Sequence, residues 1–211
     1  MTEQRFTLPA LPYDFNALQP YISEVSLSHH YKLHAEYVKK ANELIEKVPH
    51  YIPFSIEQII KMAHEAHPEL YYYASQHYNH SIFWNCLSPE SSQGFISKAL
   101  LSDIENNFGS IDNMFLEIDK LAEGIHASAW IFLTAKEFVP SNGNLQLIIC
   151  NNGDSPLVVP DSGTPVLAID MWEHAYYLDF TNANAEYITN ICKEMLNWKY
   201  ISDRYASIAD E

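Results

Sequence analysis

A carboxylate and an imidazole stand four residues apart in the segment Asp170–Tyr177, which is otherwise mostly apolar and aromatic. The run Val166–Ile169 directly before it is typical of a buried strand. Ionisable side chains are rarely buried unless they are paired or bound to a metal. Asp170 and His174 therefore fit two ligands of one metal, and on this segment alone they fit a buried hydrogen-bonded pair equally well.

Eight of the ten histidines lie before residue 81, and most of them cannot be metal ligands. The spacing of apolar residues predicts a long helix over residues 23–48, which Pro49 ends. On this helix His29, Leu33 and Tyr37 recur every four residues and therefore share one face. A hydrogen-bonded place in the core is the commoner outcome for any single histidine.

A second helix is predicted over residues 65–87, which are dense in aromatic residues and histidine. Gln76 and His80 are four residues apart on one of its faces, and Trp84 follows one turn later. Core packing is again the default role for each of these side chains. A metal site is indicated only when the two helices are combined with Asp170 and His174.

The order of the predicted elements indicates an α+β fold in two parts. We expect residues 1–89 to form an N-terminal helical-hairpin domain of two long helices. Residues 90–211 are expected to form a C-terminal α+β domain with a small three-stranded antiparallel sheet, after a boundary at the turn-forming run Ser88–Gly94. The elements predicted in the second part are helices over 96–107, 111–123 and 187–198, with a shorter helical turn after the last, and strands over Ala129–Phe138, Leu145–Asn151 and Pro165–Asp170, the first two joined by a turn at 141–143.

Composition narrows the class of protein. The 211 residues are 47% hydrophobic, which is enough for a buried core, and the formal net charge of −15 disfavours nucleic acid and anionic membranes as partners. No apolar run approaches the roughly 20 residues that span a bilayer, and no signal pattern opens the chain, so we expect a cytoplasmic protein. Three cysteines without short spacing argue against a disulfide framework or a cysteine-rich zinc site, so a metal would have nitrogen and oxygen ligands.

Four motifs, in order along nearly the whole chain, carry a resemblance to a known family. They are Phe6–Tyr13, His29–Val38, Gln76–Pro89 and Asp170–Tyr177. With these motifs the chain resembles the iron/manganese superoxide dismutase family. The last motif alone is specific, and all four together leave little room for chance.

The resemblance implies one iron ion per subunit, with manganese possible, held by His29, His80, Asp170 and His174. Three imidazoles and one carboxylate suit a first-row ion such as iron or manganese. The implied activity is that of a superoxide dismutase. It converts two superoxide anions and two protons to dioxygen and hydrogen peroxide, while the metal is alternately reduced and oxidised.

The same resemblance implies roles for residues around the ligands. Gln76 hydrogen-bonds the solvent on the metal, and Tyr37 lies at the substrate entrance and helps to relay protons. Glu173 bonds a ligand histidine of a partner subunit, and Tyr177 belongs to the same interface, so a homodimer is implied. The remaining supporting residues are a structural histidine and three tryptophans that wall the site: His34, Trp84, Trp130 and Trp172.

The place of the glutamine favours iron over manganese. In iron-type members of the family the glutamine precedes the second-helix ligand by four residues, which is the place of Gln76. In manganese-type members it comes from an Asn-Gln-Asp-Ser-Pro-like run, and the matching run Asn152–Pro156 has Gly153 at that position. The run Trp84–Leu87 also has the iron-type form. Ligands are identical in both types, and some members use either metal.

Three positions depart from the family pattern. Counted from His29, the entrance histidine of the family falls on Leu33, which cannot donate to Tyr177 of the partner subunit. Asn184 stands where an arginine is usual, and His126 stands where an aromatic residue is usual. Either these are neutral changes around an intact site, or turnover is substantially below the diffusion-limited rate of superoxide dismutases.

Two other functions compete with this one. Zinc at the same site would activate water for hydrolysis, but no carboxylate other than Glu173 stands near the ligands to act as the base. A non-catalytic or attenuated dismutase-like metal-binding protein is the other alternative. A retired enzyme is expected to lose ligands, whereas this chain keeps all four that the resemblance implies.

Overall fold

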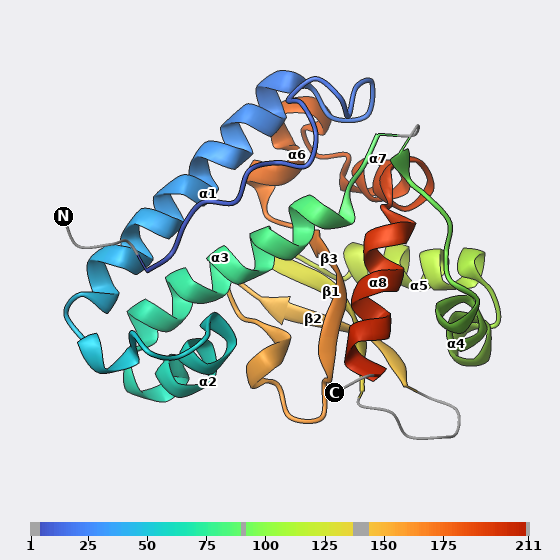
Figure 1. Cartoon of the computed structure of the whole chain (residues 1–211). Helices are drawn as coiled ribbons and strands as arrows, with labels where there is room; N and C mark the ends of the chain where they lie inside the picture. The colour runs from blue at the N-terminus through green and yellow to red at the C-terminus, as the bar shows by residue number, and fades with distance from the viewer. Residues whose placement is uncertain (1–4, 90–91, 137–143, 210–211) are drawn as a thin grey trace.

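Two long helices form the frame of the first half of the chain. In the computed structural model, which describes residues 5–89, 92–136 and 144–209, they are α1 (Glu24–Ile45) and α3 (Pro68–Cys86). The hydroxyl of Ser23 accepts a hydrogen bond from the Ser26 N–H and so caps α1. The two helices run side by side (Figure 1), which confirms the predicted α-hairpin.

A shorter helix, α2 (Ile56–Ala66), fills the connection between them and was not predicted. It follows a single 3₁₀ turn (Pro49–Tyr51) and begins with a capping box, in which Ser55 and Gln58 each bond the other's backbone N–H. Its buried face packs against α3. The sequence signal for this helix is the capping-box pair Ser55 and Gln58.

The second half is built around the predicted three-stranded antiparallel sheet, whose strand order is β2–β1–β3. The strands are β1 (Ala129–Ala135), β2 (Leu145–Asn151) and β3 (Thr164–Asp170). Every residue of β1 is buried, because helices cover the sheet. The predicted end of the first strand at Phe138 and the turn at 141–143 lie outside the described residues.

The predicted closing helix over 187–198 is wrong in its extent. The chain forms α7, then the π-helical turn η4, and then a full helix, α8, where only a short turn was expected. At the break, Leu196 pairs as an isolated β-bridge with the distant residue Leu87. The Ser88 N–H donates to the carbonyl of Met195, and the Asn197 N–H donates to the carbonyl of Cys86. The elements of the second half outside the sheet are α4 (Lys98–Phe108), α5 (Ile111–Glu123), a 3₁₀ turn (Pro156–Val158), α6 (Glu173–Phe180), α7 (Asn184–Asn190), η4 (Ile191–Met195) and α8 (Trp198–Ala209).

Helix α3 is the central element, because it packs against α1 and α2 on one side and against β3 on the other (Figure 1). The architecture is therefore an N-terminal α-hairpin joined to a C-terminal α/β part. The end of β3 lies beside both long helices, because Asp170 contacts His30 on α1 and His80 on α3, and α6 packs against α1. Among the described residues, no helix is both long enough and apolar enough to cross a bilayer.

Candidate metal centre

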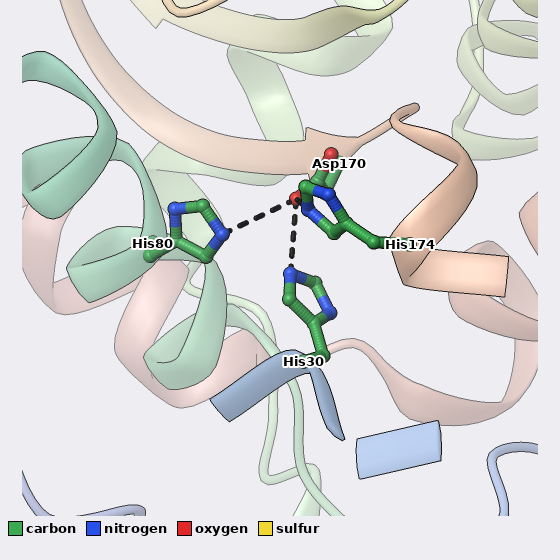
Figure 2. Close-up of side chains that lie close together, drawn as sticks. All are labelled: His30, His80, Asp170 and His174. Carbon is green, nitrogen blue, oxygen red and sulfur yellow. Dashed lines mark hydrogen bonds and ion pairs between the residues drawn. The ribbon is translucent and has the colours of Figure 1, made fainter. Parts of the chain in front are cut away.

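Three imidazoles surround one carboxylate oxygen at the junction of the two halves. Oδ2 of Asp170 lies 3.0 Å from Nε2 of His30 and 3.1 Å from Nε2 of His174. The Nε2 atom of His80 is 3.5 Å from the same oxygen. Figure 2 shows the three rings pointing toward the carboxylate, and the four donor atoms all lie within 4.8 Å of one another.

The structure brings His30 into this donor group, and not His29, which the sequence had indicated. Successive residues on a helix point about 100° apart, so only one of two adjacent histidines can face a given neighbour. His30 is 3% exposed and contacts Asp170, whereas His29 lies on the solvent side of α1. The signal lies in the buried residues of α1, which include Leu27, His30, His34, Val38 and Ala41.

His34 is buried beside the donor group. Counted from His30 instead of His29, the fourth residue is His34 and not Leu33. The indole N–H of Trp84 donates to Nδ1 of His34 at 2.9 Å, and Nε2 of His34 lies 2.8 Å from Nδ1 of His77. Both ring nitrogens are therefore engaged inside this chain.

The ring of His80 is fixed in the state that a metal requires. Its Nδ1 donates to the backbone carbonyl of Gln76 at 2.7 Å, so in the neutral ring the lone pair lies on Nε2. That Nε2 atom is fully buried and has no hydrogen-bond partner among the described residues. An orphaned imidazole nitrogen aimed at a carboxylate fits a metal ion, and three nitrogen donors with one oxygen donor suit iron or manganese.

Burial keeps two of the three imidazoles, those of His30 and His80, neutral. It lowers the pKa of His30 to about 4 and holds the pKa of His80 well below its ordinary value. Burial alone would raise the pKa of Asp170, but the imidazoles of His174 and His30 hold it below its usual range. The Trp172 N–H also donates to Oδ1 of Asp170 at 2.9 Å. One buried carboxylate charge thus stands beside the two neutral imidazoles of His30 and His80.

Gln76 lies beside the ligands with one end of its amide free. The indole N–H of Trp130 donates to Gln76 Oε1 at 3.2 Å, while the buried Nε2 bonds no described residue. The strand register places Trp130 opposite Asp170. A Cβ atom on Gly153 would lie 2.7 Å from the ring of Tyr72 and 3.1 Å from Cγ of Gln76. A side chain at residue 153 would therefore overlap the ring of Tyr72 and crowd Gln76.

Tyr37 lies against the metal centre in a group of three tyrosines. Its ring centroid is 5.3 Å from that of His80, and the rings of Tyr72 and Tyr73 are both 6.2 Å away. Burial and the neighbouring Tyr72 raise the pKa of Tyr37 well above its ordinary value. The phenol therefore keeps its proton at neutral pH.

Two more of the predicted tryptophans contact ligand rings. Trp84 meets His30 edge-on at 4.6 Å, and Trp172 stacks on His174 at 5.4 Å. The indole of Trp172 also donates to the carbonyl of Asn152 at 3.0 Å. With Trp130, whose ring lies 4.9 Å from His80, these side chains surround the donors with apolar surface.

Glu173 and Tyr177 point away from the donors. Both are exposed on α6, so the structure does not bring them into the metal centre. Glu173 instead lines a cavity of about 450 Å³ together with Asn184 and His126, two of the positions that depart from the family pattern. Sequence reasoning missed this cavity, and it also missed His77 and Tyr72.

Comparison with known proteins agrees with this geometry. The profile for iron/manganese superoxide dismutases, alpha-hairpin domain, matches residues 5–88, and the profile for the C-terminal domain of the same enzymes matches residues 96–204. The chain belongs to the iron/manganese superoxide dismutase family. The activity of this superoxide dismutase family, and a metal that is iron or manganese, follow from that membership.

Relatives in the superoxide dismutase family span the whole chain. The iron enzyme of Synechococcus elongatus is 38% identical over 205 residues, covering 96% of this chain and 98% of its own. The manganese enzyme of Rhizobium meliloti is 34% identical over 97% of this chain and 98% of its own. The iron enzyme of Coxiella burnetii is 34% identical over 96% and 99%. Both metals are named among relatives, so similarity does not choose between them.

The correction from His29 to His30 can be tested with a matched pair of variants. We expect His30→Ala to weaken metal binding roughly 100-fold or more, since it removes a donor rather than one of its supports. His29→Ala should bind metal like the parent chain, because His29 faces solvent. Metal content per chain after reconstitution, measured by elemental analysis, checks both. Loss of metal from His29→Ala with retention in His30→Ala would contradict the assignment.

The space beside Gln76 can be tested by adding one carbon atom. Gly153→Ala should cost roughly 1–3 kcal/mol of stability and displace Tyr72 or Gln76, because the added Cβ overlaps the Tyr72 ring. Gly124→Ala is the control, since its Cβ would come no closer than 3.4 Å to its nearest neighbour, the backbone carbonyl oxygen of Leu121. Thermal unfolding and the visible spectrum of the metal form measure the effect. Equal behaviour of the two variants would show that the space is not limiting.

Proposed function

We propose that this superoxide dismutase works with iron. The observation that supports the proposal is the position of Gln76 on α3, with its free amide nitrogen buried beside the ligands and Gly153 leaving room for it. A glutamine from the loop after β2, which the manganese-type pattern has, would have to share this volume. The chain supplies the hydrogen-bond donor from the helix instead.

Bound iron would supply the redox chemistry, taking an electron from one superoxide ion and giving it to the next. The residues that would hold this ion are His30, His80, Asp170 and His174. Gln76 Nε2 is placed to donate to a solvent molecule at the centre, which tunes the potential of the metal. Tyr37 keeps its phenolic proton and can pass it toward the substrate side.

The surroundings of the centre determine how an anion reaches it. Three neutral imidazoles and one carboxylate leave residual positive charge on a trivalent ion, which attracts superoxide at short range. At longer range the chain carries a net charge of −15, and Asn184 adds no cation to its cavity. Slow capture of superoxide therefore stays a prediction, which rests on Asn184 and on the overall negative charge.

Metal identity is tested by paired reconstitution. We expect chain purified from cells supplied with both metals to contain about one iron per subunit, and the iron form to dismute superoxide faster than the manganese form. The reason is that the potential set by Gln76 suits one metal and not the other. Elemental analysis and a dismutase assay on both forms give the answer. Higher activity with manganese would overturn the iron assignment, and stoichiometric zinc without activity would favour a hydrolase.

We also propose a homodimer formed through the surface of α1 and α6. Glu173 and Tyr177 are exposed there, and Leu178 is a further exposed apolar residue. The two helices pack together, and the backbone N–H of Ser23 donates to Asp179 at 2.9 Å, so Val25 belongs to the same region. Exposed apolar side chains gathered beside a functional site are typical of an interface.

A charge placed on this surface should separate the subunits. Leu178→Asp is expected to give monomers in sedimentation equilibrium, because it buries an unpaired carboxylate at the interface. Leu116→Asp on α5 is the control, since both leucines are 55% exposed. The proposal fails if the unmodified chain sediments as a monomer, or if the control dissociates as readily.

A cytoplasmic location stays a prediction from the sequence.

A further inference from the structure

A second pair of buried imidazoles lies next to the metal centre. His34 is fully buried and His77 is 7% exposed, and neither belongs to the donor group. Nε2 of His34 lies 2.8 Å from Nδ1 of His77. On its other side, His34 Nδ1 accepts the indole N–H of Trp84 at 2.9 Å. Trp84, His34 and His77 thus form a three-member chain of hydrogen bonds, which we call the imidazole chain.

The imidazole chain has only one possible direction while its rings are neutral. An indole N–H can only donate, so Nδ1 of His34 must accept. The proton of His34 is then on Nε2, which donates to Nδ1 of His77, and His77 carries its own proton on Nε2. Burial lowers the pKa of His77 to about 4 and lowers that of His34 further, so both rings are neutral at pH 7.

Two members of the imidazole chain touch metal ligands. The ring of His34 stacks on that of His80, with centroids 5.1 Å apart and planes 22° from parallel. Trp84 meets the His30 ring edge-on at 4.6 Å. The His34 ring therefore covers one face of the His80 ring, and its orientation limits the orientation of His80. Without an acceptor at His77, the buried Nε2–H of His34 would have no hydrogen-bond partner. Because an unsatisfied buried donor is unfavourable, the ring of His34 would be expected to rotate.

The acceptor itself is held in place from two sides. The Ser81 hydroxyl donates to the backbone carbonyl of His77 at 2.7 Å, and its oxygen lies 3.4 Å from Nδ1. The ring of Phe6 meets that of His77 edge-on at 5.7 Å. Phe6 is fixed in turn, since its backbone N–H and C=O both bond the side chain of Asn42 at 2.8 Å. His77 is thus a rigid acceptor.

We propose that His77 is a positioning residue of the metal centre, which fixes the tautomer and orientation of His34 and through it the orientation of the ligand His80. This role goes beyond the dismutase activity, and its iron readouts rest on the proposed iron form. His77 does not touch the donors or the substrate, so its effect must appear in the electronic structure of the bound metal.

Two substitutions separate the hydrogen bond from the volume of the ring. His77→Leu keeps much of the volume and offers no acceptor, whereas His77→Asn places an amide oxygen close to the position of Nδ1. Tyr78→Phe is the control: it removes a buried hydroxyl from the next residue of α3, where it accepts a hydrogen bond from Arg204 at 3.0 Å. All three are made in the full chain.

We expect the ferric electron paramagnetic resonance spectrum and the midpoint potential to shift in His77→Leu. His77→Asn should return both toward the parent values, and Tyr78→Phe should leave both unchanged. A purely structural role would move His77→Leu and Tyr78→Phe alike in stability without this selective recovery. Parent-like spectrum and potential in metal-loaded His77→Leu would overturn the proposal.

Nitrogen-15 NMR of the metal-free parent chain tests the first step without iron. We expect the proton of His34 on Nε2, in a downfield resonance that disappears in His77→Leu. A proton found on Nδ1 of His34 would overturn the proposal, even if His77→Leu failed to fold. If the chain proved to use manganese, the iron assignment would fail, while the NMR result and the spectrum of the manganese form would still decide the role of His77.

Discussion

The burial of one carboxylate charge is the constraint on which this structure depends. Asp170 is fully buried at the end of β3, and its neighbours include His30 and His80, which burial itself keeps neutral. A buried anion beside neutral groups is unfavourable unless a cation compensates it. The end of β3, the start of α6 and the helices α1 and α3 meet at this point. The fold thus buries a negative charge that a bound metal cation would compensate.

Helix α3 gives the surroundings of this buried charge a defined geometry. Within three turns it carries Gln76, His77, His80 and Trp84, and each takes part in a hydrogen bond that fixes a ring or an amide. The backbone carbonyl of Gln76 selects the tautomer of His80. The side chain of the same residue meets Trp130 from the sheet. One helix therefore links the ligands, their hydrogen-bond partners and the opposite wall of the site.

Most of the site could be predicted from the sequence, and the failures have physical causes. His80, Asp170 and His174 stand alone at their positions, so motif and periodicity agree on them. His29 and His30 are adjacent, and only the packing of α1 against α3 and α6 decides which one faces inward. The same packing leaves Val25, an apolar residue near the start of α1, exposed. Helix α2 and the break before α8 depend on a cap and on a bridge between distant residues, which periodicity does not record.

That bridge, between Leu87 and Leu196, has a consequence for how metal reaches its ligands. It joins the end of α3 to the segment before α8, while α3 also packs on β3. The helical hairpin and the sheet are thereby held together by backbone pairing that does not involve the ligands. The two halves cannot separate without breaking the pairing of Leu87 with Leu196. A metal ion can therefore enter by separation of the two halves only if this pairing breaks.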